Sequence, residues 1–236
     1  MIELLGGTKA EEPQTGDVLF LYDPATNKDL ISDTVVGAIK TATEVDPAVL
    51  IDGQSTLKTS SVNSGVLITL PTALDLETMQ NWTLEWSSIW NAYQSGYATE
   101  LFMDITNTAG FPIGCRWTDG GYQERNQFNA SDWNNARIWR PSSTKTQVIG
   151  QLNRWALVRK GSYFFVMLNG VRQLLENGTV NGTKQSLFNK TQALPTVTKM
   201  YLGYFNATNR CYPGNFGRIR FSNFARYVGD YTPQPF

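Results

Sequence analysis

The chain has 236 residues, of which 41% are hydrophobic and 12% aromatic, enough to bury one substantial core. Lys+Arg and Asp+Glu both number 20, so the formal net charge is zero, and no basic stripe with interleaved aromatics is present to neutralise phosphates. Histidine is absent, which removes the commonest general base and every Ser-His or Cys-His nucleophile pair. We therefore expect one main domain that binds no nucleic acid and is not an enzyme.

Cysteine usage and hydropathy set two further bounds. The two cysteines, Cys115 and Cys211, form no CxxC pair, and without histidine they cannot complete a thiol-containing metal site. Whether they form a disulfide stays open, because a cytosolic setting keeps thiols reduced. The longest apolar runs, such as residues 163–168, are too short to span a bilayer, so no membrane partner is expected.

Residues 1–44 differ in composition from the rest of the chain. A turn-rich stretch at 11–16 precedes a short apolar run at 18–22, and residues 30–43 fit either a short helix or an extended arm. This segment has too few apolar residues for a core of its own, so it must pack on the main domain, on a neighbouring subunit or on a larger assembly. We interpret it as an extended N-terminal arm that anchors the protein. Its expected assembly contacts are Val18, Leu19, Phe20 and Tyr22.

From residue 45 onward, short β-branched and aromatic runs alternate with Gly, Asn, Asp and Pro, a pattern typical of an all-β sandwich. Several of these runs alternate strictly between apolar and polar residues, which places one face on a core. The sequence therefore predicts a two-sheet antiparallel jelly-roll sandwich over residues 45–236. The expected strands are 65–70, 82–88, 99–105, 113–117, 153–159, 163–168, 199–204 and 214–221.

The best-specified unit runs from Trp155 to Gly170. Lys160-Gly161-Ser162 lies between two strong strand runs and predicts a tight hairpin. Asn169-Gly170 follows the second strand as a turn into the next segment.

The motifs of this unit resemble a known superfamily. Trp155-Ala156-Leu157-Val158-Arg159, a glycine turn and Leu168-Asn169-Gly170-Val171 recur together with three other stretches, 82–86, 201–203 and 216–222, in the expected order. On these residues the chain resembles the concanavalin A-like lectin/glucanase superfamily, and specifically LamG-like domains of the kind found in bacteriophage structural proteins. The resemblance covers about residues 46–236 and implies the sandwich fold more strongly than any one function.

A glucanase of this superfamily would need a trio of carboxylates on one strand. The nearest arrangement here is Glu100 and Asp104, with apolar Phe102 between them. Their spacing separates them by about 13 Å along a strand, too far for retaining or inverting hydrolysis. We interpret both as solvated strand residues, so no catalytic residue is predicted.

The resemblance also implies a calcium site, since LamG-like and legume-lectin relatives hold this ion at the sandwich rim. No contiguous calcium-loop pattern is present, so no cofactor is predicted and Ca²⁺ stays an open alternative. The weak metal candidates are Asp104 and Asp119, with Asp132, Asn134 and Asn135 also at rim positions.

Residues 117–140 concentrate aromatic side chains with Asn, Asp and Arg, as sugar-binding platforms do. The alternative is that the same aromatics fill the core or an interface between subunits, where Trp, Tyr and Arg are also enriched. If the domain binds a glycan, the expected ligand-binding residues are Trp117, Tyr122, Trp133, Trp139 and Arg140.

The phage-like resemblance, the arm and the lack of a catalytic trio together predict a non-enzymatic virion structural protein, assembled in the host cytoplasm. The first hypothesis is a capsid decoration protein that docks on the major capsid protein and stabilises the head as a homo-oligomer. The alternative is a tail-fibre or tail-tip module, partnered by tail proteins, that recognises a host surface glycan. A glycoside hydrolase that depends on Glu100 is the third hypothesis.

Overall fold

The computed structural model is all-β, and none of the residues that it describes is helical. For β10, β11 and β15 to β17, only the backbone is described. The same holds for β9, except at Leu101 and Met103. The described residues are 18–39, 43–60, 64–92, 98–105, 113–117, 124–127, 149–180, 183–185, 188–189, 194, 196–203, 213–227 and 229–235.

The larger sheet contains eleven strands in the order β14-β13-β12-β8-β19-β1-β2-β3, with β17 paired to β13, β6 to β19 and β5 to β6. All of its pairings are antiparallel. Its strands are β1 (Val18–Asp23), β2 (Lys28–Asp29), β3 (Thr34–Val35), β5 (Thr43–Ile51), β6 (Gln54–Thr59), β8 (Asn81–Trp90), β12 (Leu152–Lys160), β13 (Tyr163–Leu168), β14 (Val171–Arg172), β17 (Phe188–Asn189) and β19 (Gly214–Ser222).

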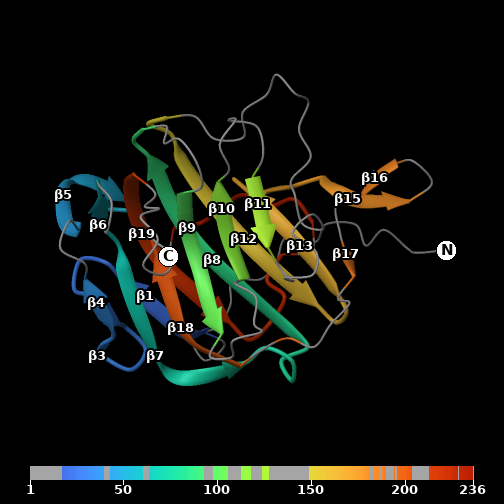
Figure 1. Ribbon diagram of the computed structural model, residues 1–236, viewed down its shortest axis with the longest axis horizontal. Helices are drawn as coiled ribbons and strands as arrows, with labels where there is room; N and C mark the ends of the chain where they lie inside the picture. The colour runs from blue at the N-terminus through green and yellow to red at the C-terminus, as the bar shows by residue number, and fades with distance from the viewer. Residues whose placement is uncertain are drawn as a thin grey trace.

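The smaller sheet has six antiparallel strands in the order β11-β10-β9-β18-β7-β4. Figure 1 shows this sheet lying in front of the larger one, with a separate two-stranded hairpin, β15–β16, at one side. The strands are β4 (Gly37–Ile39), β7 (Val66–Asp75), β9 (Ala98–Ile105), β10 (Ile113–Trp117), β11 (Glu124–Gln127) and β18 (Thr196–Leu202), and the hairpin is β15 (Leu175–Val180) with β16 (Thr183–Gln185).

The two-sheet sandwich predicted from the sequence is confirmed, and each of the eight expected strands overlaps an observed one. The hairpin between β12 and β13 closes at Lys160 opposite Tyr163, with Gly161 at φ 59°. Asn169 and Gly170 form the next turn with φ of 50° and 81°. Positive φ at both central residues matches the right-handed twist of the strands, and Asn-Gly adopts it at little cost.

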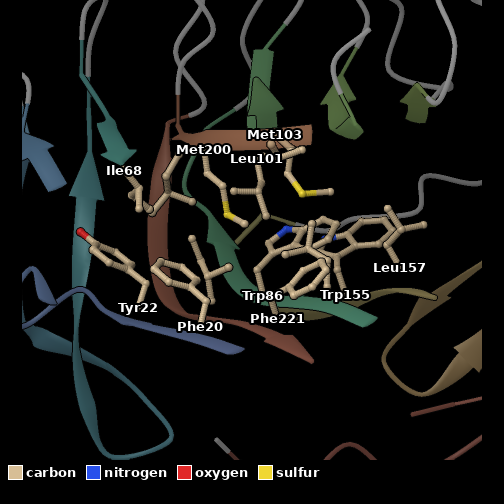
Figure 2. Close-up of a cluster of buried hydrophobic side chains, with 14 of the residues drawn as sticks. Phe20, Tyr22, Ile68, Trp86, Leu101, Met103, Trp155, Leu157, Met200 and Phe221 are labelled. Atoms are coloured by element: carbon tan, nitrogen blue, oxygen red, sulfur yellow. The ribbon is translucent and has the colours of Figure 1, made fainter. Parts of the chain in front are cut away.

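The core lies between the facing sides of the two sheets. Trp86 on β8 and Trp155 on β12 stack at 5.9 Å between ring centroids, and neither is more than 2% exposed. Figure 2 shows side chains of the smaller sheet, including Ile68, Met103 and Met200, opposite the side chains of the larger sheet in this cluster. Burial of this continuous apolar cluster is the main force that holds the sheets together.

Residues 18–39 belong to the sandwich, and this corrects the prediction of an extended arm over residues 1–44. β1 pairs with β19, and Phe20 and Tyr22 are 1% and 0% exposed in the chain's own core. The Tyr22 hydroxyl donates to Asn27 Oδ1 at 2.9 Å, so its polar end is satisfied within the same chain. Because Phe20 and Tyr22 are buried here, they cannot serve as the predicted assembly contacts; Val18 and Leu19 are half-buried. Residues 1–17 lie outside the described residues.

The chain between Thr34 and Ile39 joins the sheets at one edge. Thr34 and Val35 pair with β2 in the larger sheet, whereas Gly37 to Ile39 pair with β7 in the smaller one. Val36 lies between them, and its carbonyl accepts a hydrogen bond from Thr69 N at 2.9 Å. Of the two alternatives for residues 30–43, a short helix or an extended arm, the helix is therefore excluded for residues 30–39, where β3 and β4 form.

Candidate functional site

The outer face of the larger sheet is covered by two segments. The tip of the β5–β6 hairpin lies over β19 and β8, where Ile51 is 3% exposed and an added Cβ at Gly217 would meet it at 3.0 Å. Asp52 at this tip forms an ion pair with Arg154 on β12. The C-terminal residues 223–227 and 229–235, which we call the strap, lie on another part of this face. Its residues Ala225, Tyr227 and Tyr231 pack on Ala156, Val158, Phe165 and Met167.

The strap is fixed at both of its ends. Near its start, the Thr83 hydroxyl donates to the Phe224 carbonyl at 2.8 Å and accepts from Arg226 N at 2.9 Å. Farther along, Tyr231 N donates to the Gly170 carbonyl at 2.8 Å, and the rings of Tyr227 and Tyr231 stack at 3.5 Å. The β12–β13 part of the larger sheet is thus covered on its outer face as well as on its core face.

The smaller sheet presents side chains outward from β7 and β18. On β7, half-buried Leu67 and exposed Thr69 alternate with buried Val66, Ile68 and Leu70, as a strand with one face on the core requires. On β18, half-buried Lys199 and Tyr201 flank buried Met200 in the same way. Alternation and burial together therefore assign Leu67, Thr69, Lys199 and Tyr201 to the outer face.

The strand register arranges these residues in two rows across the sheet. In the first row, Ala38 lies opposite Leu67, and Leu67 lies opposite Tyr201, which pairs in turn with position 102 of β9. In the second row, Thr69 lies opposite Lys199, which pairs with position 104. We call the five residues Ala38, Leu67, Thr69, Lys199 and Tyr201 the ligand face.

The ligand face combines an apolar row with an adjacent polar row. A tyrosine ring beside aliphatic side chains offers a flat surface for the apolar side of a ring-shaped ligand. The Thr69 hydroxyl can donate and accept hydrogen bonds, and the Lys199 ammonium can donate three. This combination is suited to a polyhydroxylated ligand such as a sugar.

The ligand residues predicted from the sequence fall largely outside the described residues. Trp117 ends β10 in the smaller sheet, with its backbone opposite Ala98 and Glu124, and its side chain is not described. The other four predicted residues, Tyr122, Trp133, Trp139 and Arg140, lie in undescribed segments, as does the metal candidate Asp119. Tyr201 and its neighbours were not among the residues predicted from the sequence, although the alternation within 66–70 and 199–202 is a signal that could have found them.

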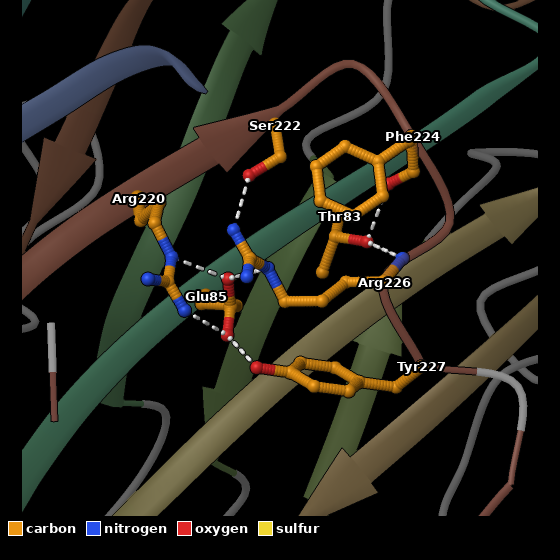
Figure 3. Close-up of polar contacts among 7 residues, drawn as sticks. All are labelled: Thr83, Glu85, Arg220, Ser222, Phe224, Arg226 and Tyr227. Carbon is orange, nitrogen blue, oxygen red and sulfur yellow. Dashed lines mark hydrogen bonds and ion pairs between the residues drawn. The ribbon is translucent and has the colours of Figure 1, made fainter. Parts of the chain in front are cut away.

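A second polar cluster, centred on Glu85, lies beneath the strap (Figure 3). Arg220 binds both carboxylate oxygens of Glu85, at 2.7 Å and 2.9 Å. Arg226 Nε lies 3.1 Å from Glu85 Oε2, and the Tyr227 hydroxyl donates to Oε1 at 2.7 Å. The Glu85 side chain is 3% exposed, so the pair of guanidinium groups neutralises a charge that burial would otherwise disfavour.

The electrostatics of this cluster are those of a structural hub. Burial raises the pKa of Tyr227 and of Tyr231, and the charge of Glu85 raises both further. Burial alone would lower the pKa of Arg220, but the hydrogen bonds and charge of Glu85 outweigh it, so this pKa lies above the ordinary value. Most glycoside hydrolases use a pair of carboxyl groups, and Glu85 is the one carboxylate among the described side chains of this cluster. The observed contacts of the cluster secure the strap.

The described residues contain no group of three or more His, Cys, Asp or Glu side chains that could hold a metal ion. They also contain no helix with the length and hydropathy needed to cross a bilayer. Of the carboxylates weighed from the sequence, Glu100 and Asp104 lie on β9, where only their backbone is described.

Comparison with known proteins gives structural neighbours but no sequence family. No protein-family profile matches the chain, and no curated protein matches it. Trypanosoma rangeli sialidase, in complex with 2,3-difluorosialic acid, is similar with a TM-score of 0.61 at 13% identity over 90% of this chain and 32% of that one. Domain 4 of AbnA, a GH43 extracellular arabinanase from Geobacillus stearothermophilus in complex with arabinotriose, is similar with a TM-score of 0.57 at 13% identity over 89% of this chain and 94% of that domain. The binding domain of Paraclostridial Mosquitocidal Protein 1 has a TM-score of 0.60 at 10% identity, over 89% of this chain and 49% of that one.

At these identities the likenesses show the fold alone. The chain shares its β-sandwich fold with the matched parts of these three proteins. It spans about a third of the sialidase chain, so that match assigns no enzymatic activity to it.

Proposed function

We propose that this chain is a non-enzymatic glycan-binding module and that the ligand face of the smaller sheet is its binding surface. One observation carries the proposal. Among the described residues, the β5–β6 hairpin and the strap lie on the outer side of the larger sheet, and Tyr201 and Leu67 lie beside Thr69 and Lys199 on the outer side of the smaller sheet. A broad sheet face with an aromatic row and a polar row suits a sugar chain.

The structural neighbours support the same proposal at the level of the fold. The arabinanase domain is similar over nearly its whole length and was solved with a sugar, arabinotriose. The mosquitocidal protein domain is described as a binding domain. A sandwich of this size therefore exists as a separate module in other proteins, and we infer a comparable role here.

The resemblance of the sequence to LamG-like domains of phage structural proteins suggests where the module acts. We propose that it forms part of a virion, as a tail-fibre or tail-tip domain that binds a host surface glycan, with tail proteins and further copies of itself as partners. If the module also binds calcium at the rim of the sandwich, the candidate ligands are Asp104 and Asp119.

A capsid decoration role is the second candidate, and exposed aliphatic residues favour it. Ile31, Val35 and Ile39 are 49%, 70% and 44% exposed along the edge where β3 and β4 join the sheets. An apolar edge of this kind fits a permanent contact with a neighbouring capsid subunit.

A binding experiment on the full chain tests the leading proposal. Wild type, Tyr201→Ala and Tyr163→Ala would be applied to a glycan array that includes arabino-oligosaccharides and sialylated glycans. Tyr163 is a matched control, because it is an exposed tyrosine on β13 of the other sheet. We expect binding by wild type and Tyr163→Ala and at least a tenfold loss with Tyr201→Ala. Binding that is unchanged in Tyr201→Ala, or absent from wild type, would reject the ligand face.

Immunogold electron microscopy of purified particles would separate the two virion candidates. Label on the tail supports the receptor-binding role, and label over the head supports decoration. Particles without label would reject the virion assignment while leaving the array result unaffected.

A further inference from the structure

Arg159 is an unusual core residue. It belongs to β12, where its neighbours along the strand on the same side are Trp155 and Leu157, and the whole residue is 1% exposed. A buried guanidinium loses its hydration, and this loss is tolerated only where other polar groups replace the water.

The Arg159 guanidinium is surrounded by four main-chain carbonyl oxygens and one side-chain amide oxygen. Its Nη1 binds the Leu76 carbonyl and lies 2.9 Å from the Met79 carbonyl and 3.3 Å from the Glu77 carbonyl. Its Nε donates to the Gly161 carbonyl at 2.9 Å, and its Nη2 lies 3.5 Å from Gln80 Oε1. We call these five oxygen atoms the carbonyl cage.

The cage has the chemistry of a cation site. Three of the five oxygens lie around Nη1, and the five together match the five N–H donors of the guanidinium. Backbone carbonyls and amide oxygens are also the neutral ligands that calcium and similar hard cations take. Burial lowers the pKa of Arg159 and the charge of Glu77 opposes this shift, but a guanidinium stays protonated in proteins. The charge of the guanidinium is thus balanced by several converging dipoles.

The cage joins elements of both sheets. Residues 76–80 connect β7 of the smaller sheet to β8 of the larger, and Gly161 belongs to the β12–β13 hairpin. Gly161 N donates in turn to the Gln80 carbonyl at 2.8 Å. Glu77 Oε2 accepts from Leu194 N at 2.8 Å, just before β18 begins. One positive charge therefore ties together the connections that lead into β7, β8, β13 and β18.

We propose that Arg159 is a built-in cation that takes the place of a bound metal ion at this rim of the sandwich. Without its side chain, the carbonyl cage is a latent site for a small hard cation or an alkylguanidinium. The proposal concerns the rim alone and does not depend on glycan binding.

Substitutions that separate charge from volume test the proposal on the full chain. Arg159→Lys keeps a positive charge in the cage, whereas Arg159→Met keeps a long side chain without charge. We expect a clearly higher Tm for Arg159→Lys than for Arg159→Met. A Tm of Arg159→Met equal to or above that of Arg159→Lys would overturn the proposal. It would show that the space between the oxygens must be filled by a side chain but that no positive charge is needed there.

Chemical rescue gives the second readout. Arg159→Ala would be titrated with ethylguanidinium and, separately, with calcium chloride, and its Tm or refolding yield followed. We expect recovery that rises with concentration and saturates for at least one of these ions, with no recovery for Arg159→Met, whose side chain occupies the cage. Equal responses of Arg159→Ala, Arg159→Met and wild type would show general ion effects and overturn the latent site.

Discussion

The Tyr227 hydroxyl donates to Glu85 at 2.7 Å across 142 residues of sequence, and through this bond the last described segment of the chain is held against the middle of the larger sheet. Glu85 is also the shared anion of Arg220 and Arg226, so three side chains of the C-terminal region depend on one carboxylate. This relationship makes Glu85 the residue through which the strap is most easily weakened.

Replacing Glu85 with Gln keeps the size of the side chain but removes its charge. Both buried guanidinium groups then lose their counter-ion, and breaking a buried pair in this way typically costs about 3–5 kcal/mol. We expect a loss of that order in the free energy of unfolding, measured by urea denaturation. Lys58→Ala is the control, since Lys58 pairs with Glu44 at 3.4 Å on the surface and should cost about 1 kcal/mol or less. Equal losses in the two variants would contradict a buried hub.

Gly170→Ala should loosen the strap at its other end. Gly170 has φ of +81°, and an added Cβ would overlap the Tyr231 carbonyl oxygen. Gly53→Ala is a matched control, because Gly53 has φ of +76° with nothing within 4 Å. Left-handed strain of about 1–2 kcal/mol is common to both variants. We expect a larger loss of stability in Gly170→Ala, together with new binding of a hydrophobic dye to the uncovered apolar face. Equal stability and no dye binding would show that the strap tolerates the displacement.

Two N-terminal deletions should behave differently. Removal of residues 1–17 leaves every described strand in place, so we expect a cooperative unfolding transition. Removal of residues 1–44 takes away β1 to β4, with Phe20 and Tyr22, and the first two residues of β5. Truncating one such buried aromatic side chain to alanine already costs about 3–5 kcal/mol. We expect the longer deletion to abolish cooperative unfolding, as followed by circular dichroism. A stable fold of residues 45–236 would support the original prediction that residues 1–44 form an arm outside the main domain.

Alkaline pH should destabilise the fold through three buried tyrosines. Burial raises the pKa of Tyr22, Tyr227 and Tyr231 above the ordinary value of 10.0. Above about pH 10 the unfolded chain loses these phenolic protons while the folded chain keeps them, so the stability falls as pH rises. We expect phenolate absorbance to lag in the native protein and to rise together with unfolding. Full phenolate absorbance at pH 11 with the fold intact would contradict this assignment.

The strands of the main domain could be predicted because their evidence is local. Alternation and glycine turns mark β7, β8, β12 and β13 within a few residues of sequence. The β5–β6 hairpin was missed although Asp52-Gly53 is a strong turn signal, because Glu44, Asp46 and Pro47 interrupt the apolar pattern of β5. Polar composition hid a strand whose pairing with β6 does not require a buried face.

The N-terminal segment was misread for a different reason. Phe20 and Tyr22 are buried by pairing with Phe221 and Ile219 of β19, about two hundred residues away. Local composition showed correctly that this segment has no core of its own, but it could not show which surface completes it. That information lies in contacts of long sequence separation, which no local pattern carries.

The candidate site shows the same limit. A dense run of aromatics drew attention to residues 117–140, and that prediction stays untested for Trp117, Tyr122, Trp133, Trp139 and Arg140. In the sequence, Tyr201 lies between Met200 and Leu202, and apolar neighbours of this kind are typical of a core residue. Only the register with Leu67 and the burial of its two neighbours assign it to the outer face.

The strap and the hairpin tip on the larger sheet give the molecule a front and a back. The described chain enters through β1 of the larger sheet and ends in the strap on the outside of that same sheet, so both ends belong to the covered side. An assembly that holds several copies by this side would present the ligand face of every copy outward. Weak affinity at each face would then add up to firm adhesion to a repetitive surface, and loss of one face would matter little.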